Sequence, residues 1–284
     1  MTQRIRSEDG ESGRETTGAA SRGNDIAQYK ADDRHFVAAL ARGLEVLACF
    51  RSGEGTLSNQ EIAQRCNLPK STVSRLTATL TRLGYLTIEE ASGKYQLGVA
   101  TLALGVGMLA KLDIRQIARP LMQEVADFAQ ASVSLAVRDR LSMLYIENCR
   151  SRAALTLSLD VGSRIPIASS ALGRAYLAEA GNSERGEVIE RISELDPQTG
   201  DAIIRGLEQA LLDYERHGCA CSFGDWNPNV NAIAIGLKLG GRFPLMAINC
   251  GGPAFQLSPE FLLGEVRPRL QDVVHRLTES VGVS

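Results

Sequence analysis

Residues 57–83 have the sequence LSNQEIAQRCNLPKSTVSRLTATLTRL, which predicts two helices separated by a tight turn. Ser58 and Glu61 have the spacing of a capping box, in which each side chain satisfies a backbone N–H group of the first helical turn. A helix is therefore expected to begin near Ser58. Pro69 disfavours helical geometry in the residue before it but fits the first turn of a new helix, so the first helix should end near Asn67.

The predicted second helix has an apolar stripe and a polar face of mostly short side chains. Its stripe consists of Val73, Leu76, Leu80 and Leu83. Its outward face carries Ser71, Ser74, Arg75, Ala78 and Arg82. Such a face suits a helix in the major groove, because bulky side chains would block its approach and arginine can bond a guanine edge with two hydrogen bonds. An ordinary solvated helix face is the alternative.

The elements around this pair complete a recognisable arrangement. An apolar face at Val37, Leu40, Leu44 and Leu47 predicts a preceding helix over residues 34–50. Residues 84–98, GYLTIEEASGKYQLG, alternate in polarity on both sides of a Ser-Gly turn, which is typical of a β-hairpin. Three helices followed by a hairpin describe a winged helix-turn-helix domain. Lys94 is predicted to lie at the hairpin tip and to contact a DNA phosphate.

Charge and composition agree with this interpretation. The chain has 284 residues, of which 44% are hydrophobic, and this is enough for two modest domains. Residues 34–98 carry 8 basic and 5 acidic side chains, whereas residues 112–284 carry 17 and 21. The basic part of the chain therefore contains the helix pair, as expected for a surface that faces phosphate.

Composition also predicts a disordered tail and a soluble protein. Residues 1–33 are rich in Gly, Ser, Thr and charge, so they are predicted to be a disordered tail. The chain has no long apolar run and its N-terminus lacks the apolar core of a secretory signal. We therefore expect a soluble, cytoplasmic protein without membrane partners.

The six cysteines of the chain form no CxxC pair, so buried or unreactive thiols are the default expectation.

Three segments, ALARGLEVLACF, LSNQEIAQRCNLPKSTVSRLTATLTRLGYL and GKYQLG, resemble in this order the DNA-binding domain of the IclR family of bacterial transcription regulators. LPKSTVSRL is the strongest single match. The resemblance implies a winged helix-turn-helix domain over residues 34–98, with the helix after Pro69 as recognition helix. The DNA-facing candidates that it implies are Lys70, Ser71, Thr72, Ser74 and Arg75. Helical periodicity places Thr72 nearer the buried edge, so Thr72 ranks below the others for base contact.

Residues 99–112, VATLALGVGMLAKL, combine small and larger apolar side chains. Small residues at spacings of three and four allow another helix to approach closely, at Ala103, Gly107 and Ala110. We expect a linker helix that pairs with its counterpart in a dimer, as the resemblance also implies. A buried helix within one chain is the alternative. The glycines lower helix propensity, which favours a partner or a hinge.

Residues 113–284 are predicted to form an α+β domain with a mostly antiparallel sheet. Alternating polarity predicts strands at 132–139, 141–148, 154–160, 219–222, 232–239 and 244–249. Helices are predicted at 113–129, with a kink at Pro120, at 184–195, at 201–216 and after Ser258. By resemblance this is the GAF-like effector-binding domain of the same family.

A ligand site is predicted where residues 162–175, GSRIPIASSALGRA, run from a loop into a helix. The first turn contains Ser169, Ser170 and Ala171, and a helix start offers unpaired N–H groups and a positive dipole to an anion. A plain serine N-cap is the alternative. The resemblance implies small organic acids as effectors and so favours a carboxylate here.

Two further stretches are candidates for the same site. Asp225 and Trp226 precede a buried strand and would wall a pocket or form a surface turn. Asn249 and Cys250 stand next to glycines, whose missing side chains leave room for a ligand or a tight loop.

The segment HGCAC at residues 217–221 raises the question of a metal. Only Cys219 and Cys221 share a strand face, and no second pair of ligands accompanies them, so no metal and no cofactor are expected. Redox sensing by these two thiols is a minor alternative, with only His217 and Arg216 nearby to lower their pKa values.

The expected function is ligand-responsive transcription regulation. His35, His217 and His275 are distant from any nucleophile elbow, phosphate loop or paired acids, so the chain is not expected to be an enzyme. We expect a homodimer or dimer of dimers that binds operator DNA of a catabolic operon and responds to a small organic acid, aromatic acids being the sub-family expectation. The alternative is a DNA-binding regulator controlled by thiol oxidation or protein contacts, and an enzyme with a GAF-like domain is less favoured.

Overall fold

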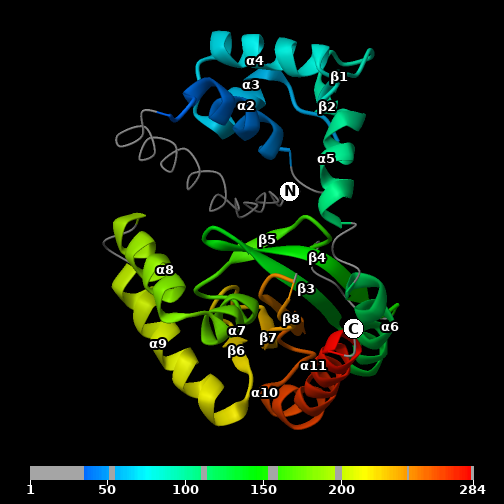
Figure 1. The fold of residues 1–284 in the computed structure, drawn as a ribbon, viewed down its shortest axis with the longest axis vertical. Helices are drawn as coiled ribbons and strands as arrows, with labels where there is room; N and C mark the ends of the chain where they lie inside the picture. The colour runs from blue at the N-terminus through cyan, green and yellow to red at the C-terminus, as the bar shows by residue number, and fades with distance from the viewer. Residues whose placement is uncertain are drawn as a thin grey trace, which may run out of the picture. The chain divides into compact units, whose positions relative to one another are not determined.

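The computed structural model describes residues 35–282 apart from 51–54, 110–113, 153–158, 196–199 and 242. The predicted tail at 1–33 and most of the predicted strand at 154–160 fall outside these residues. The chain divides into two compact units, and the division falls between Thr101 and Leu102, inside helix α5 (Val99–Leu109). Figure 1 shows the two units.

The first unit contains three helices and a hairpin. Its elements are α2 (Ala38–Ala48), α3 (Asn59–Cys66), α4 (Lys70–Arg82), β1 (Leu86–Ile88) and β2 (Tyr95–Leu97). The two strands pair antiparallel. They close a small core that includes Val46, Ile62, Val73 and Leu86. This is the predicted winged helix-turn-helix architecture.

The helix boundaries in this unit follow from local signals that the sequence contains. The capping box is present, since Ser58 Oγ accepts from the backbone N–H of Glu61 and the Glu61 carboxylate accepts from the N–H of Ser58. Asn67 ends α3 in the left-handed conformation with φ of 50°. Pro69 is the N-cap of α4 rather than a residue of its first turn.

The apolar stripe of α4 is shorter than periodicity predicts. Val73 is buried and Leu76 and Leu80 are half-buried, but Leu83 is 61% exposed. The helix ends at Arg82, so Leu83 is its C-cap, and its side chain no longer follows the stripe. Thr77 is buried in the stripe instead, where its hydroxyl donates to the carbonyl of Val73.

The second unit is an α+β structure with a six-stranded sheet. Its strands are β3 (Ser132–Asp139), β4 (Ser142–Arg150), β5 (Arg164–Pro166), β6 (Ala220–Phe223), β7 (Val230–Leu237) and β8 (Met246–Pro253). They have the order β5-β4-β3-β8-β7-β6, and every neighbouring pair is antiparallel. The sequence predicts a loop over this stretch, whereas the structure has the short strand β5 there.

Helices cover both faces of this sheet (Figure 1). They are α6 (Ile114–Ala129), α7 (Ala171–Glu179), α8 (Asn182–Leu195), α9 (Gly200–His217), α10 (Pro259–Phe261), a π-turn (Leu262–Val266) and α11 (Arg267–Gly282). One core lies between the sheet, α6 and α11. The other lies between the sheet and helices α7, α8 and α9. Because side chains alternate along a strand, β3, β4, β6, β7 and β8 contribute to both cores, whereas the short β5 contributes only Ile165 to the second core.

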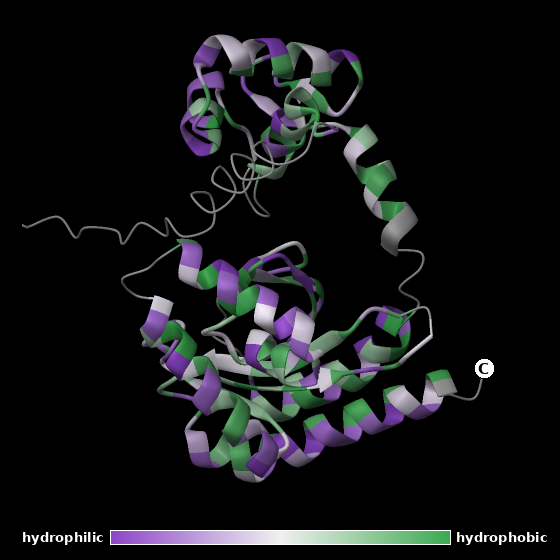
Figure 2. Ribbon diagram, turned by 60° about the vertical axis from the view of Figure 1, so that its left-hand side comes forward, coloured by the Kyte–Doolittle hydropathy of each residue, from purple (hydrophilic) through white to green (hydrophobic). Residues whose placement is uncertain are grey.

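The hydropathy of the helices matches this arrangement. Figure 2 shows hydrophobic and hydrophilic residues interleaved along α11, as expected for a helix with one buried side. In the described part of the chain, no helix is long and apolar enough to cross a membrane.

Candidate functional site: a recognition helix and a sensor cavity

The first candidate surface is the N-terminal half of α4. Lys70, Ser71, Ser74 and Arg75 are exposed there, whereas Thr72 is half-buried, in agreement with its position on the helical wheel. The five predicted DNA-facing residues therefore occupy one end of one helix, and four of them are open to a partner.

Hydrogen bonds to α3 fix the orientation of this end of α4. Asn59 Nδ2 donates to Ser74 Oγ at 3.0 Å, and Ser74 Oγ donates to the carbonyl of Lys70 at 2.9 Å. Lys70 Nζ donates to Gln60 Oε1 at 3.2 Å. The sequence prediction did not include Asn59 and Gln60, although their place at the start of α3, directly after the N-cap, is the signal that could have suggested them.

Lys94 directly precedes β2 rather than occupying the tip of the hairpin. Its Nζ lies 3.8 Å from Glu61 Oε2, so the hairpin contacts the start of α3. Hydrogen bonds from the side chain and the backbone of Ser58 lower the pKa of Glu61, and the side chain makes the larger contribution. The charge of Lys94 lowers this pKa further. The phosphate contact of Lys94 stays a prediction.

The second candidate site is a cavity in the α+β unit, between the sheet and the start of α7. The empty space within it and in the solvent at its mouth together amounts to about 480 Å³. Its lining comprises Ser132, Ser134, Tyr145, Asn148, Leu159, Ile165, Ser170, Ala171, Ser222, Trp226, Val230, Ala232, Asn249 and Gly251. These are apolar surfaces with hydroxyl and amide groups, and no charged side chain is among the described lining residues.

Polar groups gather at one side of the cavity in a hydrogen-bonded cluster. The backbone N–H of Ser134 donates to Asn249 Oδ1 at 3.2 Å, and Ser134 Oγ donates to Asn148 Oδ1 at 2.9 Å. The hydroxyl of Tyr145 is hydrogen-bonded to the side chains of Ser134 and Asn249, and burial raises its pKa to about 12. Tyr145 therefore stays a neutral hydroxyl at physiological pH.

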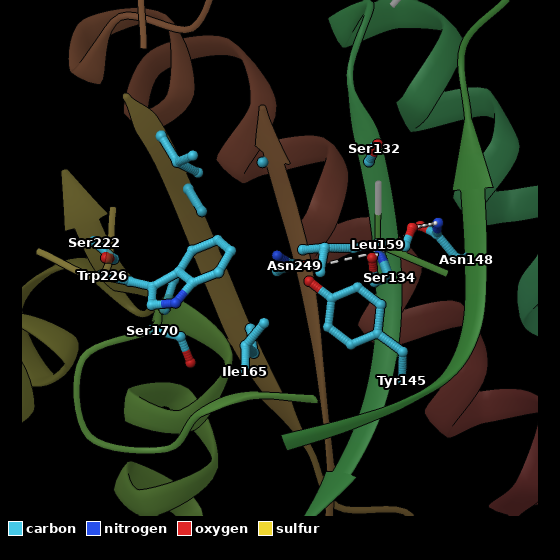
Figure 3. A pocket seen from close by; sticks show the side chains of 14 residues that line it. Ser132, Ser134, Tyr145, Asn148, Leu159, Ile165, Ser170, Ser222, Trp226 and Asn249 are labelled. Carbon is cyan, nitrogen blue, oxygen red and sulfur yellow. Dashed lines mark hydrogen bonds between the residues drawn. The ribbon is translucent and has the colours of Figure 1, made fainter. Parts of the chain in front are cut away.

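The loop between β6 and β7, which carries Trp226, forms the other side of the cavity. Trp226 and Tyr145 therefore face the cavity from opposite sides (Figure 3). Buried Arg174 holds this loop. Its Nη1 lies 2.7 Å from Asp225 Oδ2 and donates to the carbonyl of Cys221 at 2.7 Å. The only tryptophan of the chain thus projects from a loop that an ion pair fastens to α7.

The structure brings four of the seven predicted effector residues to this cavity, namely Ser170, Ala171, Trp226 and Asn249. It does not bring Ser169, Asp225 or Cys250 to the lining. The carbonyl of Ser169 accepts from Ser222 Oγ. Cys250 lies in the core on the opposite face of the sheet, and its burial there raises its thiol pKa to about 12.

Ser170 is also the N-cap of α7, where its hydroxyl accepts from the N–H of Gly173 at 3.2 Å. This bond is the alternative that the sequence left open, and it occupies one lone pair of the hydroxyl that also lines the cavity.

The cavity residues on β3 and β4 were missed from sequence. Polar residues among apolar ones on these strands, at Ser132, Ser134 and Asn148, are the signal that could have indicated them. Without the register of the two strands, that pattern is equally typical of a solvated sheet face.

The two cysteines at the start of β6, Cys219 just before the strand and Cys221 within it, interact with each other. A hydrogen bond from the Cys221 thiol lowers the pKa of Cys219, while the same contact and burial raise the pKa of Cys221. Among the described residues, no group of three His, Cys, Asp or Glu side chains is placed to hold a metal ion.

A winged helix-turn-helix unit joined to an α+β unit is typical of DNA-binding transcription regulators. The family profile for the IclR helix-turn-helix domain matches residues 39–89, and that for the bacterial transcriptional regulator IclR C-terminal domain matches residues 106–279. The chain belongs to the IclR family. Its relatives are transcription regulators rather than enzymes.

Individual relatives extend this match over most of the chain. The HTH-type transcriptional regulator TsaQ1/TsaQ2 of Comamonas testosteroni is 35% identical over 243 residues, which are 84% of this chain and 86% of that protein. The crystal structure of an IclR family transcriptional regulator from Brucella abortus is 47% identical and has a TM-score of 0.76, covering 88% of this chain and 94% of that chain.

An IclR homolog from Microbacterium hydrocarbonoxydans, crystallised in complex with 4-hydroxybenzoate, has the same fold. It is 24% identical with a TM-score of 0.69, and the match covers 87% of this chain and 100% of that chain. At this level of identity the similarity concerns the fold alone.

Proposed function

We propose that this regulator acts in the cytoplasm as a homodimer, or a dimer of dimers, that reads a pseudo-palindromic operator through α4. A small organic acid, aromatic in type, binds in the cavity of the α+β unit and changes operator affinity, and the operon so controlled is catabolic. The exposed end of α4, with Lys70, Ser71, Ser74 and Arg75, supports the DNA contact.

The lining of the cavity is the observation that carries the effector proposal. Two aromatic side chains, Trp226 and Tyr145, face it from opposite sides, and aromatic side chains favour stacked or edge-to-face contact with another ring. Hydroxyl and amide groups around Ser134 and Asn249 offer hydrogen bonds to a ring substituent. A carboxylate would be held by neutral donors such as these, because the described lining contains no cationic side chain.

The sole tryptophan gives a direct test. Small aromatic and aliphatic acids, with 4-hydroxybenzoate among them, are titrated into the full-length protein while the emission of Trp226 and the melting temperature are recorded. We expect at least one aromatic acid to change both, with a stoichiometry of one per chain, and to alter operator binding in an anisotropy assay. If no acid in the panel changes Trp226 emission or melting temperature, the effector proposal is wrong.

Control by thiol oxidation is the second candidate, and the contact between Cys219 and Cys221 is the observation that favours it. It predicts that hydrogen peroxide or diamide changes operator affinity in the wild type and not in Cys221→Ser. Equal operator affinity before and after oxidation would eliminate this candidate.

A further inference from the structure

Strand β4 lies between the cavity and helix α6, and it contributes side chains to both. Tyr145 and Asn148 line the cavity on one face. On the other face Glu147 forms ion pairs with α6. In a regular strand Tyr145 and Asn148, three positions apart, would point to opposite faces.

A β-bulge explains how both reach the cavity. Leu135 of β3 pairs with Glu147, but the next residue, Ala136, pairs with Tyr145. Ile146 is therefore the extra residue of a bulge, and it packs into the core on the α6 side. A bulge changes the direction of side chains and locally breaks the ladder of hydrogen bonds. The bulge thus lies between Tyr145, which faces the cavity, and Glu147, which faces α6.

Glu147 is buried, with a side chain only 5% exposed, between two arginines. Its Oε1 lies 2.7 Å from Arg119 Nη1 and its Oε2 lies 3.2 Å from Arg115 Nη2. Separating a buried carboxylate from its cationic partners is costly, because the charge would remain without compensation. The two ion pairs therefore resist a displacement of this part of β4 away from α6.

Two further contacts extend this connection along α6. The Cys149 thiol donates to the carbonyl of Arg119, and Gln123 Nε2 donates to the carbonyl of Arg150 at 2.9 Å. The α6 residues involved are Arg115, Arg119 and Gln123, which are spaced by four and lie on one helix face. The same helix is the first that follows α5 along the chain.

We propose that Glu147 is a positioning residue that transmits occupancy of the cavity from β4 to α6, and so toward the connection with the DNA-binding unit. The inference rests on the proposed ligand-responsive function. A ligand between Trp226 and Tyr145 displaces β4 at its bulge, and the paired Glu147 carries the displacement to Arg115 and Arg119. Without Glu147, a displacement of β4 reaches α6 only through the contacts of Cys149 and Gln123, so the response of α6 is smaller.

The test fills the cavity by mutation, so it requires no ligand. Ala232 lines the cavity from β7, and Ala232→Leu occupies part of the space from the side away from β4. Hydrogen exchange of the peptide covering residues 114–129 is measured in the full-length wild type, Ala232→Leu, Glu147→Gln and the double variant. We expect Ala232→Leu to change exchange in α6 about fivefold when Glu147 is present and less than about twofold in the Glu147→Gln background.

A purely structural role for Glu147 would give a different result. Glu147→Gln would then alter α6 exchange by the same factor whether the cavity is filled or not. Equal effects of Ala232→Leu in both backgrounds, or no effect in the wild type, would overturn the proposal. If either variant fails to fold, Ala232→Val and Arg119→Gln replace them, since the first is smaller and the Arg119 side chain is 60% exposed.

Arg138→Gln is the matched control. Arg138 of β3 lies between Glu184 and Glu187 of α8, each at 2.9 Å, which is the same three-charge arrangement with the signs reversed. The response of α6 to Ala232→Leu should survive this change. Its loss would mean that general loosening of the sheet, and not Glu147, controls the response.

Failure of the proposed function is recognised separately. The titration of Trp226 with acids, 4-hydroxybenzoate included, decides whether the cavity binds an effector, whereas the exchange experiment decides whether β4 and α6 are coupled. If β4 and α6 are coupled but no acid binds the cavity, the proposed effector is wrong and the proposed role of Glu147 stands.

Discussion

Ser58 and Glu61 define the start of α3 through two reciprocal hydrogen bonds. Ser58→Ala removes an N-cap, so we expect the free energy of unfolding of the DNA-binding unit to fall by about 1 kcal/mol. Urea denaturation followed by circular dichroism measures this change. Ser71→Ala, at an exposed position within α4, is the control and should leave stability nearly unchanged. A loss equal to that of the control would contradict the capping role.

The contact between Ser58 and Glu61 also predicts how the free energy of unfolding depends on pH. Hydrogen bonds from Ser58 lower the pKa of Glu61 below its ordinary value of 4.5. A lowered pKa means that the carboxylate stabilises the folded state above pH 4.5 and that this contribution is lost as the pH falls through the folded-state pKa. Wild type should therefore lose stability relative to Glu61→Gln between about pH 5 and pH 3. Parallel curves for the two proteins would show that Glu61 contributes nothing.

Tyr145, in contrast, predicts a loss of stability as the pH rises. Burial raises its pKa from 10.0 to about 12, so its contribution is complete below pH 10 and is lost as the pH rises toward 12. By pH 11 the wild type should lose about 1 kcal/mol of unfolding free energy that Tyr145→Phe does not lose. Chemical denaturation at pH 9 and pH 11 tests this. An identical loss in both proteins would mean that Tyr145 titrates as an exposed phenol.

Arg75 is the α4 residue for which base readout is proposed. Arg75→Ala should weaken binding to the specific operator by about 1–3 kcal/mol and relax preference at one base position. Arg82→Ala, an exposed arginine in the last turn of the same helix, is the matched control for loss of charge. Anisotropy titrations against operator variants distinguish the two. Unchanged discrimination by Arg75→Ala would assign Arg75 to phosphate contact or to none.

At the scale of the elements, the loop between β6 and β7 is held in place by an ion pair. The ion pair of Asp225 with buried Arg174 holds the loop that carries Trp226. Asp225→Ala should loosen the loop and increase acrylamide quenching of Trp226 about twofold, since a loop held by fewer contacts opens more often. Asp139→Ala, which removes the ion pair of Arg164 at 2.6 Å elsewhere in the sheet, should leave quenching unchanged. Equal quenching in wild type and Asp225→Ala would mean that other contacts hold the loop.

The sequence predicted most elements because their signals are local. The capping box at Ser58 and the alternation over β3, with its bounds Ser132–Asp139, need no knowledge of the tertiary fold. The short strand β5 was missed, since three residues with Pro166 among them give no alternation and pair only because β4 lies beside them.

The cavity was predictable only in part, for the same physical reason. Ser170 and Trp226 stand in polar stretches that break the apolar pattern, so the sequence indicates them. Tyr145 reaches the cavity together with Asn148 through the bulge at Ile146, and a bulge depends on the register of two strands. The ion pairs of Glu147 likewise join residues 28 positions apart or more, which no local pattern reveals.

At the scale of the whole molecule, the connector α5 lacks the polar face of a solvated helix. Its exposed apolar residues are Val99, Leu102, Leu104 and Val106, with exposures of 80, 63, 62 and 51%. Figure 2 shows this helix without a continuous hydrophilic side. A helix that is apolar around its circumference is stable in water only when another surface covers it. The proposed homodimer supplies that surface from a second copy of α5.

Leu102→Asp tests the dimer, because a carboxylate between two apolar helices would lose its hydration without gaining a partner. We expect the molar mass measured by sedimentation to fall by half and operator affinity to fall at least about a hundredfold, since two linked recognition helices bind far more tightly than one. Leu212→Asp, at a 50% exposed leucine of α9, is the control and should change neither quantity. An unchanged mass with Leu102→Asp would mean that α5 is covered within its own chain, and the operator would then be read by some other pairing of α4 helices.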